Sequence, residues 1–179
     1  MSQRFNRPDA AGVLHYVTIN VRDRRPAFSK AAYTQELLDT LRAACDEFPA
    51  RLVCYVVMPN HLHFIVHPQG GQLGRFLSRF KPAATKRYDA LAATMNHEKA
   101  RAWLSTPQGR NLWQDGKHSL HLWSDKLIWQ KIRYIHDNPV RAGLVTHPAD
   151  YPWSSYGAFA PESGHKLPVA VDSDWWWES

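Results

Sequence analysis

The chain has 179 residues, 44% of them hydrophobic, which is typical of one domain with its own core. No apolar run reaches the roughly 20 residues that a bilayer crossing needs. The N-terminus lacks the apolar segment of a secretory signal, so we expect a cytoplasmic protein. The net charge is +6, and because the last twenty residues are net acidic, the other 159 residues carry +9. A basic body favours a polyanionic partner, although many basic proteins bind none.

The first half of the chain predicts a strand, a helix and a strand pair. Residues 13–23 are rich in β-branched and aromatic side chains, as strands are. Residues 27–48 place apolar side chains at helical spacing. Two further strands are predicted at 51–58 and 61–68, joined by a Pro-Asn turn.

The second half predicts more helix. Residues 73–95 have a basic, helical pattern in which Pro82 predicts a kink or break. Residues 96–118 are polar and irregular, and 119–123 predict a short strand. A helix is predicted over 125–138, ending before Pro139, because proline disfavours helical geometry at the residue before it.

This order of elements predicts an α+β fold with a ferredoxin-like antiparallel sheet and helices packed mainly on one face. We expect one domain over 1–159 and an acidic, Trp-rich tail over 160–179, which ends with Trp175 to Trp177 in its last five residues. The tail either packs on the body as a strap or occupies a basic groove and restrains activity.

Three histidines lie in the predicted third strand, His61, His63 and His67. Side chains two residues apart leave the same face of a strand, about 7 Å apart, so His61 and His63 can chelate one divalent ion. His67 shares that face but lies about 13 Å from His63 at strand rise, outside a shared metal site. Alternating polar residues also occur on ordinary half-exposed strands, so the pair alone leaves both interpretations open.

Tyr134 and Asn138 are four residues apart in the last predicted helix, on one face, with Gln130 one turn earlier. A phenol and an amide oxygen presented together offer a nucleophile and a metal ligand. A half-buried tyrosine and a helix-end asparagine are the ordinary alternative.

Basic side chains cluster in the predicted helix 73–95 and flank the pair Tyr134 and Asn138, where they either bind phosphates or form a solvated helix face. They are Arg75, Arg79, Lys81, Lys86 and Arg87, together with Arg133 and Arg141. The other notable side chains have no paired spacing, and we expect them to be structural or solvated: His97, His118, His121 and Cys54.

The segments YVVMPNHLHFIVHP, RYIHDNPVRAGLV and DYPWSSY, in this order, resemble the REP-associated tyrosine transposases. These form part of the single-tyrosine transposase group of the HUH endonuclease superfamily. The resemblance covers residues 13–159 and implies that 1–159 is the catalytic domain. It implies that His61 and His63 bind a divalent ion and that Tyr134 is the nucleophile. Asn138 stands where many relatives have a glutamine as third ligand, and the alternatives to it are His136 and Asp137.

The resemblance further implies a metal-dependent single-stranded DNA endonuclease and strand transferase. Such an enzyme cleaves and rejoins DNA at hairpin sequences of the REP type through a 5′-phosphotyrosine intermediate. The implied cofactor is Mg²⁺ or Mn²⁺, and two imidazoles favour Mn²⁺. We expect a nucleoid-associated monomer or homodimer.

Two alternatives remain beside this reading. One is a catalytically inactive, domesticated protein that binds hairpin DNA with the same fold. The other is a zinc hydrolase built on the same histidines, which would need a third clear histidine or carboxylate ligand.

Overall fold

A four-stranded antiparallel sheet forms the centre of the computed structural model, which describes residues 13–172. Its strands lie in the order β2-β3-β1-β6. They are β1 (Leu14–Asn20), β2 (Ala50–Met58), β3 (His61–Pro68) and β6 (His118–Leu122). Because β3 pairs antiparallel with both β1 and β2, those two strands run parallel. With α1 (Ala31–Glu47) and α2 (Leu73–Thr94), the order is β-α-β-β-α-β, which confirms the ferredoxin-like prediction.

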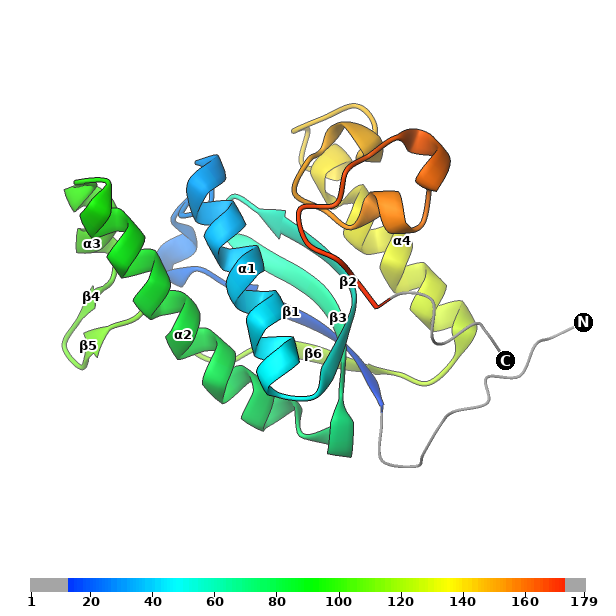
Figure 1. Cartoon of the computed structure of the whole chain (residues 1–179), viewed down its shortest axis with the longest axis horizontal. Coiled ribbons are helices and arrows are strands. Elements are labelled where there is room, and N and C mark those ends of the chain that lie inside the picture. Colours follow the sequence, from blue (N-terminus) through cyan, green and yellow to red (C-terminus); the bar gives the residue numbers. More distant parts are fainter. Residues whose placement is uncertain (1–12, 173–179) are drawn as a thin grey trace, which may run out of the picture.

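The two faces of the sheet carry different helices (Figure 1). Helices α1 and α2 cover one face, and α3 (Glu98–Trp103) packs against α2. The other face holds α4 (Asp125–Arg141), which buries Ile128, Ile132 and Ile135 against the strands. The expectation that helices pack mainly on one face therefore holds for α1 to α3, and α4 is the exception.

Both prolines that were expected to interrupt helices lie inside them. Helix α2 continues through Pro82, so the break did not occur there. The predicted end of α4 at Asn138 is wrong, because the helix runs on to Arg141 with Pro139 buried in its last turn. A proline so close to the end removes few helical hydrogen bonds, which lowers its usual penalty. Within residues 13–172, no helix combines the length and the apolar character of a membrane span.

The segment predicted to be irregular contains short elements. Besides α3 it forms a two-stranded hairpin of β4 (Ser105–Thr106) and β5 (Gly109–Arg110). Elements of six residues or fewer are too short to show a clear hydrophobic period. The chain then passes Trp113, which is buried beside Phe80, and enters β6.

The C-terminal part of the described chain covers the outer edge of β2 (Figure 1, orange to red). The backbone N–H of Ser155 donates to the Tyr55 carbonyl, and Asp172 is bound both by the Leu52 N–H and by Arg42. Residues 160–172 thus pack on the body beside β2. The tryptophans Trp175 to Trp177 lie outside the described residues, so the division at residue 159 and the role of the tail stay predictions.

Candidate active site

His61 and His63 project from β3 on the face that α4 covers. Their ring centroids lie 4.6 Å apart with the planes nearly perpendicular. The Nδ1 atom of His61 lies 2.6 Å from the Oδ1 of Asn60. An amide oxygen only accepts hydrogen bonds, so Nδ1 is the donor. The Nε2 atom of His61 then keeps its lone pair for a metal ion.

His63 is held by two hydroxyl groups from the neighbouring strand. Its Nδ1 lies 2.7 Å from Thr18 Oγ1 and 2.9 Å from Tyr16 Oη. The Thr18 hydroxyl donates onward to Tyr16 at 3.0 Å. Thr18 stands directly opposite His63 in the β1–β3 ladder. If Nδ1–H donates to Thr18, Nε2 is the atom left to bind a metal. Metal-binding histidines usually donate their other ring N–H to a neighbouring group in this way.

Burial favours the neutral form of both imidazoles, which is the form that binds metals. Desolvation is the main cause that lowers the pKa of His63 to about 3, with His61 and nearby cations adding to it. Desolvation, assisted by the charge of Arg24, lowers the pKa of His61 to about 4. Both rings are neutral at pH 7, and their hydrogen bonds in the described residues are made through Nδ1, so the pair fits a divalent ion. Among residues 13–172, no three His, Cys, Asp or Glu side chains are placed so that they could hold one metal ion together.

Tyr134 reaches this pair from α4. Its ring centroid lies 5.9 Å from that of His63 and 6.2 Å from that of Tyr16, and both contacts are edge-on. The fold therefore brings together the two motifs that the sequence places far apart. Asn138 lies one turn further along α4 and donates its Nδ2 to the Tyr134 carbonyl at 2.6 Å. None of the hydrogen bonds in the described part of the chain joins Asn138 to either histidine, so its role as third ligand stays a prediction.

The two alternatives to Asn138 differ in their surroundings. His136 is buried, with its Nε2 3.0 Å from the Ser155 hydroxyl and 3.5 Å from the Cys54 thiol. Burial lowers the pKa of His136 to about 3 and raises that of Cys54 to about 12. This cluster faces away from Tyr134 and belongs to the packing of α4 on the sheet. Asp137 is exposed and lies in the hollow beside Tyr134.

A shallow hollow of about 770 Å³ opens beside Tyr134 along α4. The guanidinium of Arg141 and the Nζ of Lys131 each lie 5.3 Å from the centroid of the Tyr134 ring. The hollow is lined by Lys126, Trp129, Gln130, Arg133, Tyr134, Asp137 and Arg141. Three of these side chains are cationic and one is anionic, so the hollow attracts a phosphate to the tyrosine.

The basic side chains of α2 do not form one surface. Arg75 and Arg79 lie over the ring of Phe48, at 5.9 and 5.8 Å from its centroid. Arg87 pairs with Glu36 at 3.2 Å. Lys81 and Lys86 instead line a second hollow, between α2 and the segment before β6. Of the seven basic residues singled out in the sequence, only Arg133 and Arg141 lie in the hollow beside Tyr134.

Three side chains of the site escaped the sequence reasoning, namely Tyr16, Thr18 and Lys131, and a fourth, His118, was expected to be structural or solvated. His118 begins β6 opposite Thr18, and its ring contacts that of Tyr16 at 6.5 Å. Alternation within the first strand puts Tyr16 and Thr18 on one face, but only strand pairing shows that this face meets His63. His67 lies at the far end of β3 beside Arg51, away from the pair, as expected.

The fold and this site define the chain as a member of a transposase class. The family model described as "Transposase IS200 like" matches residues 12–138, a range that includes both histidines, Tyr134 and Asn138. The chain belongs to the IS200-like transposase family.

Three known proteins show how far the similarity extends. A Haemophilus influenzae protein assigned as a REP-associated tyrosine transposase is 23% identical over 154 residues, 85% of this chain and 84% of the relative. A solved REP-associated tyrosine transposase bound to a REP hairpin has a TM-score of 0.66 at 22% identity, covering 97% of this chain and 93% of that one. A transposase structure from Deinococcus radiodurans has a TM-score of 0.52 at 20% identity, over 75% and 97% of the two chains. The resemblance to REP-associated tyrosine transposases is thereby confirmed.

Proposed function

We propose that this protein cleaves and rejoins single-stranded DNA at the foot of hairpins, through a covalent bond between DNA and Tyr134. The observation that carries the proposal is the contact between the Tyr134 and His63 rings, at 5.9 Å between centroids. This contact supports the proposal, because a phenol that can act as a nucleophile lies beside a histidine pair that fits a divalent ion. The relative assigned as a REP-associated tyrosine transposase and the solved neighbour that binds a REP hairpin support hairpin DNA as the substrate.

His61, His63 and Asn138 would hold the ion, Mg²⁺ or Mn²⁺. When bound, it supplies Lewis-acid polarisation of the scissile phosphate and offsets charge on the leaving oxygen. Thr18 and Tyr16 orient the His63 ring through Nδ1. Arg141 and Lys131 lie beside the Tyr134 ring and attract the phosphate.

The reaction is a pair of transesterifications. The Oη of Tyr134 attacks phosphorus, the bond from phosphorus to the 3′ oxygen breaks, and the phenolic proton passes to solvent. The 3′ oxygen takes up a proton and leaves as a hydroxyl, while the 5′ phosphate stays on the tyrosine. Attack by the 3′ hydroxyl of a second strand reverses these changes and joins the two strands. The phosphodiester energy is conserved throughout, so no ATP is consumed.

Replacement of the nucleophile tests the proposal. Tyr134→Phe should lower the yield of covalent DNA–protein adduct by a factor on the order of 10³ or more, because no other group replaces the phenol oxygen. The assay is a denaturing gel with labelled hairpin oligonucleotides and Mn²⁺. Tyr88→Phe is a matched control, because the Tyr88 hydroxyl is buried in the α1–α2 core without a hydrogen-bond partner.

The same assay separates the alternatives. If the protein only binds hairpins, the wild type and both variants should bind the oligonucleotides and none of them should form the adduct. Adduct that persists at wild-type yield in Tyr134→Phe would show that another residue is the nucleophile.

A further inference from the structure

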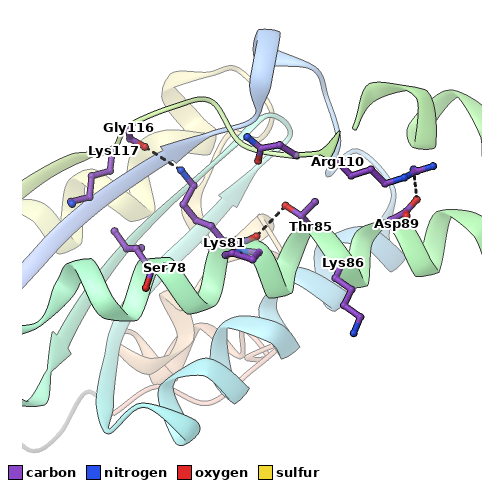
Figure 2. Close-up of a pocket in the computed structure, with 11 residues that line it drawn as sticks. Ser78, Lys81, Thr85, Lys86, Asp89, Arg110, Gly116 and Lys117 are labelled. Carbon is purple, nitrogen blue, oxygen red and sulfur yellow. Dashed lines mark hydrogen bonds and ion pairs between the residues drawn. The ribbon is translucent and has the colours of Figure 1, made fainter. Parts of the chain in front are cut away.

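A second hollow of about 800 Å³ lies apart from Tyr134, between α2 and residues 109–117. Figure 2 shows Lys81 reaching from α2 to the Gly116 carbonyl and Arg110 reaching back to Asp89. Leu77 and Pro82 give the hollow an apolar wall, whereas Thr85 and Asn111 are polar. The hollow therefore combines a surface for an apolar group with donors for a charged one.

Positive charge dominates this hollow. Its cations are Lys81, Lys86, Arg110 and Lys117, and its one carboxylate is Asp89. Asp89 is already neutralised, since its Oδ1 lies 2.7 Å from Arg110 and 3.3 Å from Arg101. Among residues 13–172, neither Lys86 nor Lys117 has a carboxylate within ion-pair distance. The hollow is therefore suited to an anion.

Lys81 is fixed in the lining of this hollow by hydrogen bonds to the backbone. Its Nζ donates to the carbonyl oxygens of Gln114 and Gly116, each at 3.3 Å. An ammonium group has three N–H donors, so one is left for a ligand. Burial and Lys117 lower the pKa of Lys81, and the neighbouring carboxylate of Asp115 opposes that change. These carbonyl contacts place a cation at a defined point instead of on a flexible surface side chain.

One lining residue of this hollow, Lys117, is next in sequence to a residue that borders the proposed active site. Lys117 directly precedes His118, the first residue of β6. The His118 ring contacts Tyr16, whose ring in turn contacts Tyr134. A DNA strand that is bound at Tyr134 and passes His118 would come next to Lys117, which lines the hollow.

We infer that this hollow holds the phosphates of the unpaired DNA strand that flanks the hairpin. The inference rests on the proposed function. A flexible single strand can enter a recess between a helix and a loop, whereas a stiff duplex cannot bend into it. Lysines bind phosphates as point charges, and Leu77 and Pro82 offer contact to a sugar or base. The Tyr134 hollow and this one then hold neighbouring parts of one substrate.

Binding measurements with paired lysine variants test the inference. The probes are a labelled hairpin, the same hairpin with an unpaired extension of about ten nucleotides on either side, and a plain duplex. Fluorescence anisotropy in EDTA reports binding without cleavage. The variant is Lys86→Ala with Lys117→Ala. The control is Lys30→Ala with Lys166→Ala, which removes the same charge from exposed lysines outside both hollows.

The Lys86/Lys117 variant should bind an extended hairpin about tenfold more weakly, while the control variant stays near wild type. The slope of log affinity against log salt should fall by about 1.4, or about 0.7 for each lost phosphate contact. Unchanged affinity for extended hairpins would overturn the inference. An equal loss for the plain duplex, or an equal loss in the control variant, would overturn it too. Because the readout is binding, failure of the Tyr134 adduct assay leaves this result interpretable.

Discussion

The two faces of the sheet take alternate residues from the same strands. Toward α1 and α2, β3 contributes Leu62, Phe64 and Val66, all fully buried in one apolar core. Toward α4, the same strand contributes His61 and His63, which meet hydroxyl groups and a tyrosine. The α1–α2 face buries apolar side chains, which are held by non-directional packing. The α4 face holds polar side chains, whose hydrogen bonds require defined distances and directions.

This difference shows how the fold supports a partly buried polar site. The α1–α2 face supplies most of the buried apolar area and so stabilises β1 and β3. The α4 face carries a smaller apolar cluster at its centre, and the polar groups lie beside it. Packing against α1 and α2 holds the strands in place, and the polar side chains that face α4 are positioned by the same strands.

The largest expected contrast is between adjacent residues of β3. Leu62→Ala should lower the free energy of unfolding by about 2–5 kcal/mol, because it opens a cavity in the α1–α2 core. His61→Ala should lower it by less than about 1 kcal/mol, since the ring is only half-buried and lies outside the apolar core, yet it should abolish metal-dependent cleavage. Urea unfolding and the adduct assay, applied to both variants, measure the contrast. Full cleavage by His61→Ala would remove His61 from the metal site.

A smaller effect should come from the hydroxyl behind His63. Thr18→Val keeps the shape of the side chain and removes the oxygen 2.7 Å from Nδ1. We expect Mn²⁺ affinity to fall by about tenfold, because loss of a group that hydrogen-bonds to a metal-binding histidine usually weakens metal binding by about this much. Titration calorimetry without DNA measures this directly. Thr40→Val, whose hydroxyl bonds its own helix backbone in α1, is the matched control on the other face and should bind Mn²⁺ normally.

The smallest effect concerns His15, the buried histidine of β1 whose two ring nitrogens have no hydrogen-bond partner. Burial, together with His121, His67 and Lys117, lowers its pKa to about 4. Between pH 6.5 and 4 the unfolded chain binds a proton there and the folded chain does not, so falling pH destabilises the fold. His15→Leu should remove about 1 kcal/mol of this loss between pH 7 and about pH 5.7. Urea unfolding of the wild type and of the variant at both pH values measures the difference. An equal loss of stability in the two proteins would contradict the assignment.

Much of the site was predictable because its signals are local. The spacing of His61 and His63 places both on one strand face, and the four-residue step from Tyr134 to Asn138 places both on one helix face. These periods follow from backbone geometry and need no knowledge of the rest of the chain. The end of α4 was not predictable in the same way, because Pro139 lies buried in the last turn, where a proline removes few helical hydrogen bonds.

Closeness in sequence did not predict which basic residues share a surface. Arg75, Lys81 and Arg87 lie close together in the chain, but α2 turns them toward Phe48, a hollow and Glu36 respectively. Conversely, Lys117 and Lys81 are far apart in sequence and line one hollow. Which cations act together depends on helix rotation and on a loop that crosses from α3 to β6.

The amino-acid sequence by itself predicted the α+β class, because side-chain periodicity is a property of short segments. Its motifs, through their resemblance to a known family, singled out the histidine pair and the tyrosine as candidate site residues. Only the tertiary structure decided that Thr18 and Tyr16 hold His63, that His118 borders the site, and that a basic hollow lies beyond β6. Those relations depend on strand order and register, which arise from long-range pairing and the burial of two different sheet faces.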